Sequence, residues 1–280
     1  MLSNQRARRP KGETVLKPMR PNVGIEIELR RRLLALIDEM NGSILYWTKA
    51  AYRQNEPDAA TLAQDETPAA EIMKAIRGLR KRWLARFDKA AKDLADYFSI
   101  AVKDRSDAAL KKILKDGGFS IEWRMTPAMK DILRATVEEN VSLIKSIPSQ
   151  HFDKIEGMVM RSVQTGRDLQ QLTDDLQKSF GVTRRRAEFI ARDQNNKATA
   201  AFRRARYIEV GIEEAIWRHS GGGREPRPSH VKAGKESVRF SVAEGWEDPD
   251  AGEKIQPGQL INCRCFCRPV LKYGAPGAAS

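Results

Sequence analysis

The stretch from residue 183 to residue 211 reads TRRRAEFIARDQNNKATAAFRRARYIEVG. It separates a part of the chain with the periodicity of helices from a part with the pattern of short strands. Its apolar side chains recur at helical spacing and Gly211 favours the end of the helix. The members of this apolar row are Ala187, Ile190, Ala191, Ala198, Ala201, Phe202, Ala205 and Ile208. A second row on the same helix is polar and comprises Arg192, Asn196, Thr199 and Arg203. We interpret this polar row as a solvated or partner-facing surface.

Downstream of Gly211 the composition changes to that of short strands. β-branched and aromatic residues gather in runs that Gly, Pro, Asp and Asn separate, which is the pattern of short strands joined by turns. The runs are IEEAIWRHS (212–220), ESVRFSV (236–242) and LINCRCFCRPVL (260–271). This pattern predicts a small α+β module.

Upstream, two long segments have the periodicity of amphipathic helices. Residues 25–47 and residues 72–98 place apolar side chains every three or four positions. The first row comprises Ile25, Leu29, Leu33, Leu36, Ile37, Met40, Ile44 and Trp47, and the second comprises Ile72, Ile76, Leu79, Trp83, Phe87, Ala90, Leu94 and Phe98. We expect both rows to face a helical core, with an interruption at residues 56–68.

The boundaries of further helices are predicted by residues that typically begin or end a helix. Thr126 followed by Pro127 is typical of an N-cap and a first helical position, and Pro148 predicts the end of that helix. Gly181 predicts the end of a short helix that begins at residue 168, and Thr183 predicts the N-cap of the long helix that follows.

Together these patterns predict an α+β fold. It is mainly α-helical over its N-terminal two-thirds, and a small C-terminal α+β module with short strands follows. The predicted divisions are a flexible basic arm (1–22), an N-terminal helical region (23–125), a helical linker region (126–183), the C-terminal module (184–273) and a loose tail (274–280).

The charge of the chain favours polyanionic partners. Fifty Lys and Arg residues against 37 Asp and Glu give a formal net charge of +13. The candidate polyanion contacts are Arg6, Arg8, Arg9, Lys11, Lys74, Arg77, Lys81 and Arg82, and a solvated helix face is the alternative explanation for the last four. No apolar run approaches the ~18 residues of a membrane span, and the basic N-terminus lacks the apolar core of a secretory signal, so we expect a cytoplasmic protein.

All cysteines lie within five residues, at positions 263, 265 and 267, which is too close for a disulfide framework. On a strand their thiols would share one face. The candidate metal ligands are His219, His230, Cys263 and Cys265, with zinc as the cofactor, although C-x-C-x-C is not the usual zinc spacing. Buried packing is the alternative. A Cys–His nucleophile is a further alternative, for which Asp248, Asp250 and Asn262 are local candidates as the orienting group.

Three fragments occur in a distinctive order: RRRAEFIARDQNNKATAAFRRARYIEVGI, then WRHSGGGREPRPSHVKAG, then PGQLINCRCFCRPV. In this order they resemble the Mu F-like phage head morphogenesis proteins, also called minor head or minor capsid proteins, over roughly residues 184–271. The helical half is similar to one phage branch of the same family. The matching positions are Arg192, Asp193, Gln194, Asn196, Trp217, Arg227, Ser229, His230, Gly234, Pro257, Gly258, Asn262, Cys263, Arg264 and Cys265. Cys267 and the GGGREP segment depart from the family pattern.

The resemblance implies a structural protein of the phage head, without an established catalytic reaction. It implies a place at the portal vertex in head assembly or genome delivery, with the portal protein and the major capsid or scaffold protein as partners, in the host cytoplasm during assembly and in the virion afterwards. We expect a structural hub that joins the helix, the R-P-S-H turn and the last strand, formed by Arg192, Asp193, Asn196, Trp217, Arg227, Ser229, His230, Asn262, Cys263, Arg264 and Cys265. Two other functions stay open: a non-specific DNA-binding virion protein, and a metal-dependent hydrolase or transferase that uses His230 with Cys263 and Cys265.

Overall fold

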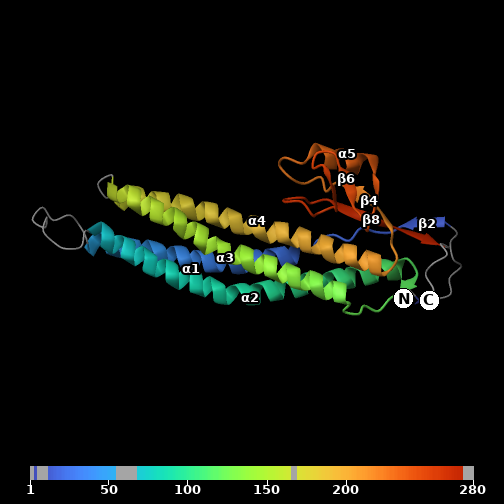
Figure 1. Ribbon diagram of the computed structural model, residues 1–280, viewed down its shortest axis with the longest axis horizontal. Coiled ribbons are helices and arrows are strands. Elements are labelled where there is room, and N and C mark those ends of the chain that lie inside the picture. Colours follow the sequence, from blue (N-terminus) through green and yellow to red (C-terminus); the bar gives the residue numbers. More distant parts are fainter. Residues whose placement is uncertain (1–2, 5–11, 55–67, 165–168, 274–280) are drawn as a thin grey trace, which may run out of the picture. The chain divides into compact units, whose positions relative to one another are not determined.

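The structure is a computed structural model that describes residues 3–4, 12–54, 68–164 and 169–273 (Figure 1). The helices are α1 (Val23–Gln54), α2 (Pro68–Asp116), α3 (Pro127–Gln164), α4 (Leu169–Glu209) and α5 (Pro228–Glu236). The strands are β1 (Ser3–Asn4), β2 (Gly12–Val15), β3 (Phe119–Ser120), β4 (Glu214–Arg218), β5 (Arg239–Ser241), β6 (Trp246–Asp248), β7 (Glu253–Ile255) and β8 (Phe266–Tyr273). The predicted α+β fold, helical first and then with short strands, is confirmed.

The chain forms two compact units, and each is assembled from separate segments. Unit 1 comprises Met1–Glu26, Tyr97–Thr136 and Arg192–Ser280, and unit 2 comprises Ile27–Asp96 and Val137–Ala191. The long helices α2, α3 and α4 each contribute residues to both units. These units therefore divide the chain differently from the consecutive segments that the sequence suggests.

Unit 2 is a helical bundle in which each helix segment has polar contacts with at least two others. These contacts include Glu39–Arg86 between α1 and α2, Asp38–Arg184 between α1 and α4, Asp88–Lys145 between α2 and α3, and Gln150–Arg186 between α3 and α4. Because these groups are largely exposed, the contacts fix the arrangement more than they add stability. The stability comes from the buried apolar rows.

The predicted apolar row of α2 is buried from Ile72 to Phe98, with Ala90 half-buried. The row of α1 differs from the prediction at its C-terminal end, where Trp47 is 45% exposed and Thr48 is 1% exposed. Position 48 lies four residues after Ile44, so the helical period turns the threonine inward and the tryptophan outward. The prediction that Trp47 is buried is wrong because it was based on apolar character alone.

Two predicted helix boundaries are wrong, because the helices continue through them. Pro148 lies inside α3, and both Gly181 and Thr183 lie inside α4. Proline removes one helical hydrogen bond, but buried side chains on both sides of it hold α3 together, namely Ile144, Ile147, Phe152 and Ile155. The Thr183 hydroxyl donates to the Ser179 carbonyl at 3.1 Å, a contact made within a helix. The predicted N-cap at Thr126 is confirmed by its hydrogen bond to the Met129 amide at 3.3 Å.

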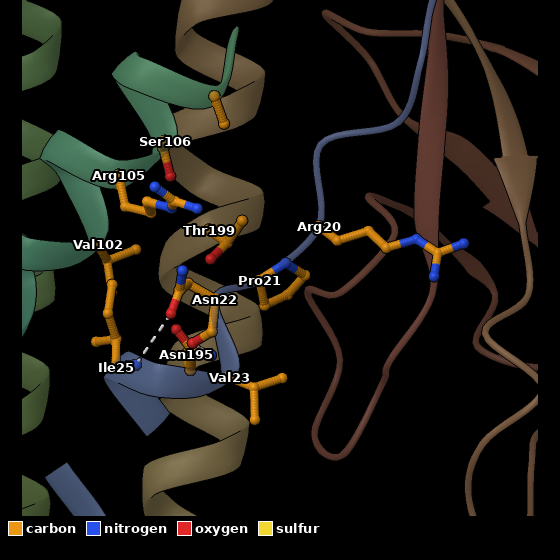
Figure 2. A pocket seen from close by; sticks show the side chains of 11 residues that line it. Arg20, Pro21, Asn22, Val23, Ile25, Val102, Arg105, Ser106, Asn195 and Thr199 are labelled. Atoms are coloured by element: carbon orange, nitrogen blue, oxygen red, sulfur yellow. Dashed lines mark hydrogen bonds between the residues drawn. The ribbon is translucent and has the colours of Figure 1, made fainter. Parts of the chain in front are cut away.

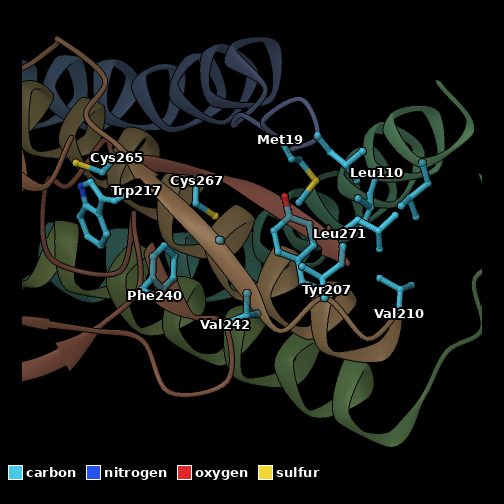
Figure 3. Close-up of a cluster of buried hydrophobic side chains, with 14 of the residues drawn as sticks. Met19, Leu110, Tyr207, Val210, Trp217, Phe240, Val242, Cys265, Cys267 and Leu271 are labelled. Carbon is cyan, nitrogen blue, oxygen red and sulfur yellow. The ribbon is translucent and has the colours of Figure 1, made fainter. Parts of the chain in front are cut away.

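The main sheet of unit 1 has the antiparallel order β2-β8-β4-β5. Trp217 of β4 lies opposite Cys267 of β8 in this sheet. Behind it is a cluster of buried apolar side chains that includes Met19, Leu110 and Tyr207 (Figure 3). Strands β6 and β7 form a separate hairpin, and β1 pairs with β3.

Strand β2 corrects the prediction of a flexible arm for residues 12–22. Leu16 and Met19 are buried, and the Leu16 amide donates to the Pro269 carbonyl at 2.9 Å. Pairing with β8 and two buried apolar side chains offset the entropy of ordering this segment. The predicted polyanion contacts Arg6, Arg8, Arg9 and Lys11 lie outside the described residues, as does the tail 274–280.

His151 of unit 2 is a buried packing histidine that should make the bundle sensitive to acid. Its Nδ1 lies 2.9 Å from the Thr183 hydroxyl, and burial, with a contribution from Lys154, lowers its pKa from 6.5 to about 4. The unfolded chain therefore binds more protons between these values, so stability is complete above pH 6.5 and is lost as the pH falls toward 4.

We expect unit 2 to lose about 2 kcal/mol from this group between pH 7 and pH 5. The measurement is the free energy of unfolding in urea at both pH values, for the wild type and for His151→Gln. Subtracting the change seen in the variant from the change seen in the wild type removes the contribution of the carboxylates, which both proteins share. The same pH dependence in both proteins would contradict the prediction.

Candidate functional site

The polar row of α4 is buried inside unit 1, which corrects its interpretation as a solvated or partner-facing surface. Asn196, Thr199 and Arg203 are 9%, 3% and 3% exposed, and Arg192 is half-buried. The Arg203 guanidinium donates to the Pro257 carbonyl at 2.6 Å. These polar side chains are buried because unit 1 surrounds this part of α4, and Arg203 has loop carbonyls as its partners.

Asp193 connects α4 to the cysteine segment. Its carboxylate accepts a hydrogen bond from the Asn262 amide and lies 3.1 Å from the Lys197 ammonium group. Asn262 has a φ of 60°, a left-handed conformation that asparagine adopts more readily than most residues. The turn immediately before Cys263 is thus held on the helix.

Gly258 brings the same loop directly against α4. A Cβ at this position would lie 3.3 Å from both the Asn196 carbonyl oxygen and the Ala200 Cβ, and its φ of +91° also favours glycine. The side chain of any other residue would press on the helix. The Pro-Gly pair of the sequence therefore marks a close contact between backbones.

At the centre of the site, the imidazole of His230 lies between two thiols and a carboxylate. His230 Nδ1 lies 3.5 Å from Cys263 Sγ and 3.7 Å from Cys265 Sγ, while its Nε2 lies 3.0 Å from Asp248 Oδ2. The four residues are between 0% and 6% exposed. The three candidate ligand atoms of His230, Cys263 and Cys265 all lie within 4.8 Å of one another.

The sequence predicts that the thiols share one face of a strand, but Cys263 and Cys265 approach each other at a turn. Cys263 and Cys265 precede β8, which begins at Phe266, and only Cys267 lies on the strand. The Cys263 amide donates to the Leu260 carbonyl at 2.9 Å, so the segment turns there and is not extended. This turn lets two thiols that are two residues apart approach one imidazole.

His219, the fourth predicted ligand, is not in this group of described residues. Its Nδ1 accepts a hydrogen bond from the Gly221 amide at 3.1 Å. Its backbone packs against α5, where a Cβ on Gly234 would lie 2.6 Å from the His219 Cβ. His219 therefore belongs to the contact between β4 and α5.

The other predicted hub residues surround the cluster. The Trp217 ring lies 5.1 Å from the His230 ring, and the Arg227 guanidinium donates to the Ile261 carbonyl at 3.2 Å. The Ser229 amide donates to Asp250 at 3.0 Å at the start of α5. Arg264 lies beside Gly222 in the glycine loop, residues 221–223. These contacts join α5 or the glycine loop to β4, to the segment before β8 or, through Asp250, to the β6–β7 hairpin.

Asp248 is the site residue that the sequence identified only as one of several orienting groups. It is completely buried, and its Oδ1 accepts from the Asp250 amide at 3.1 Å. Burial raises its pKa, but hydrogen bonds from Ser229, the Asp250 amide and His230 outweigh this and lower the pKa overall. Its position on the β6–β7 hairpin could not be inferred from residue spacing.

The cluster favours a thiolate beside a protonated imidazole. The hydrogen bond from Cys265, together with that from His230, lowers the pKa of Cys263 to about 4 against the effect of burial. Burial lowers the pKa of His230, but Cys263 and Asp248 raise it above its usual value overall. This is the chemistry of an activated thiol or a metal ligand, and the burial of the sulfur keeps it from a substrate.

A pocket of about 240 Å³ lies elsewhere in unit 1 and does not include the cluster (Figure 2). Asn22 Oδ1 accepts from the Ile25 amide at 3.2 Å, and the Asn195 side chain donates to the Asn22 carbonyl at 3.0 Å. Asn22 therefore caps α1, and α4 holds this cap in place. The hydrogen bonds of Asn22 and of the Asn195 amide nitrogen therefore have a structural role.

The fold and the site define a protein in which the polar residues of the sequence motifs form hydrogen bonds with groups of their own module. Residues 153–268 match the family described as Phage Mu protein F like protein. This match confirms the resemblance drawn from the sequence motifs. The matched segment contains His230, Asp248, Cys263 and Cys265.

The chain is also similar to a Haemophilus influenzae protein described as an uncharacterized protein. The two are 31% identical over 282 residues, which cover 97% of this chain and 58% of that protein. The chain thus spans less than two thirds of the length of this relative. No solved structure matches the chain. Among the described residues, no helix combines the length and the apolar character that crossing a bilayer requires.

Proposed function

We propose that the protein has a structural role in phage head assembly at the portal vertex, and that it assists genome packaging or delivery. Its partners are the portal protein and the major capsid or scaffold protein. The observation that carries this proposal is the family match over residues 153–268, since this family suggests head morphogenesis.

The construction of the site supports a non-enzymatic role. The polar residues of the family motif bind backbone groups of their own module, as Asp193 binds the Asn262 amide and Arg203 binds the Pro257 carbonyl. Cys263 and His230 are 3% and 2% exposed, so a substrate cannot reach them without the module opening. The motif serves to fix the fold.

An exposed aromatic pair on α1 offers a surface for a protein partner. Tyr46 and Trp47 are 67% and 45% exposed, and their rings pack edge to face with centroids 5.3 Å apart. Tyrosine and tryptophan are the residues most often found to dominate binding energy at protein interfaces.

The test is co-expression of the tagged chain with the portal protein of the same phage, followed by affinity purification. We expect the two to copurify, and the double variant Tyr46→Ala and Trp47→Ala to weaken the complex about tenfold or more. Met160→Ala, a change at another exposed apolar residue of unit 2, is the matched control. Normal infectious particles assembled without this protein would contradict the proposal.

Non-specific DNA binding is the second candidate function. Lys74, Arg77, Lys81 and Arg82 are exposed on α2 of unit 2. Binding through these cations would fall steeply with salt, with a log–log slope of about 0.9 for each phosphate neutralised. Replacing all four by glutamine should then reduce the slope, whereas the assembly role requires only weak binding of this kind.

A further inference from the structure

We infer that His230, Cys263 and Cys265 bind one thiophilic divalent metal ion, zinc under cellular conditions, which links α5 to the segment before β8. This site does not depend on the proposed function. It is argued from the positions of the ligand atoms, the support of the imidazole and the surroundings of the sulfurs.

The two nitrogen–sulfur distances are those of a tetrahedral zinc site. With Zn–S of about 2.3 Å and Zn–N of about 2.0–2.1 Å, tetrahedral angles separate the nitrogen from each sulfur by about 3.6 Å. His230 Nδ1 lies 3.5 Å and 3.7 Å from the two sulfurs. A single ring nitrogen can form one direct hydrogen bond, so two sulfurs at nearly equal distance match a shared ion better.

The imidazole is supported as metal-binding histidines usually are. Its Nε2 faces Asp248 Oδ2 at 3.0 Å, and Asp248 is held in turn by the Asp250 amide. A carboxylate on the far nitrogen fixes the ring and directs the Nδ1 lone pair toward the sulfurs. Asp248 is thus a positioning residue for the metal ligand.

The sulfur of Cys263 faces a hydrogen-bond donor of the backbone. The Gly258 amide donates to Cys263 Sγ at 3.4 Å. Amide donors of this kind stabilise the thiolate that binds a metal. Cys267, which is also buried, is not in the ligand group, so it represents a thiol that only packs.

Three protein ligands leave one position of the tetrahedron. Among the described His, Cys, Asp and Glu residues, the group consists of these three alone. A solvent molecule completes such a site in other proteins with three protein ligands. The ion would therefore have a Cys2His set with one exchangeable position.

The test uses the full chain purified from zinc-supplemented culture. We expect about one zinc per chain by elemental mass spectrometry. Replacing zinc by Co²⁺ should give thiolate-to-cobalt charge-transfer absorption and the strong visible bands of tetrahedral cobalt. Cys263→Ala and Cys265→Ala should lose this signal, whereas Cys267→Ala, the matched control, should retain it. Asp248→Asn should weaken metal affinity about 10- to 100-fold.

Cobalt titration of the wild type keeps the proposal testable if the ligand variants do not fold. A wild type that is folded by circular dichroism, carries no zinc and gives no charge-transfer band would overturn it. So would a cobalt signal that Cys267→Ala abolishes while Cys263→Ala and Cys265→Ala retain it. Neither result would affect the copurification test of the assembly role.

Discussion

Replacing Asp107 by alanine is expected to reduce the stability of unit 1 by about 3 kcal/mol, because it leaves a buried guanidinium without its main partner. Asp107 of α2 binds Arg206 of α4 through both carboxylate oxygens, with Nε–Oδ1 at 2.7 Å and Nη2–Oδ2 at 2.8 Å. The Arg206 side chain is 1% exposed. Glu209 remains 2.6 Å from Arg206 Nη1, so the loss should fall at the lower end for a broken buried pair.

The measurement is hydrogen exchange of the β4 and β8 amides, which reports the opening of unit 1 separately from that of unit 2. Asp104→Ala is the matched control, because Asp104 is 62% exposed on the same helix and its loss should cost less than about 0.5 kcal/mol. The double variant Asp107→Leu with Arg206→Met should recover much of the stability, since the buried guanidinium is removed together with its carboxylate partner. Equal effects of Asp107→Ala and Asp104→Ala would contradict the prediction.

Trp217→Ala is expected to cost about 4 kcal/mol in unit 1. Trp217 is completely buried, and its ring packs against Trp246 at 4.9 Å, His230 at 5.1 Å and Phe240 at 6.0 Å. Removing it opens a cavity between β4, α5 and the β6–β7 hairpin, and the aromatic neighbours have little freedom to fill this space.

The same hydrogen-exchange measurement applies to β4, with Trp47→Ala as the matched control at a tryptophan that is 45% exposed. Trp217→Phe should have a smaller effect than Trp217→Ala, because a six-membered ring fills part of the cavity. If Trp217→Ala cost no more than Trp47→Ala, the aromatic cluster would not be a main source of the stability of unit 1.

The sequence predicted the helices well because their apolar period is a local property. It failed where packing outweighs local preference, as at Pro148 and Gly181, through which the helices continue. It also placed Trp47 inside on hydrophobicity, although the helical period buries Thr48. The sequence predicts a turn at the R-P-S-H segment, residues 227–230, where the structure has the start of α5. Pro228 indicates this helix, because proline is favoured at the first helical position.

For the site, the sequence indicates that His230, Cys263 and Cys265 lie together, because histidine and cysteine are among the few side chains that bind metals or act as nucleophiles. What spacing could not show are the contacts between distant segments. Asp107 and Arg206 are 99 positions apart, and Asp248 reaches His230 only through the β6–β7 hairpin. The polar row of α4 predicts a solvated or partner-facing surface because the partners of Arg203, the Pro257 and Met19 carbonyls, are backbone groups that composition does not reveal.

The pairing of β2 with β8 sets an order of events during synthesis. Gly12 pairs with Tyr273, so the first strand of the main sheet has no partner until the last one has left the ribosome. All of Ile27–Asp96 and Val137–Ala191 emerge earlier. The helical bundle can therefore form before the sheet is complete, and a chain that lacks β8 would expose Leu16 and Met19 to chaperones and proteases.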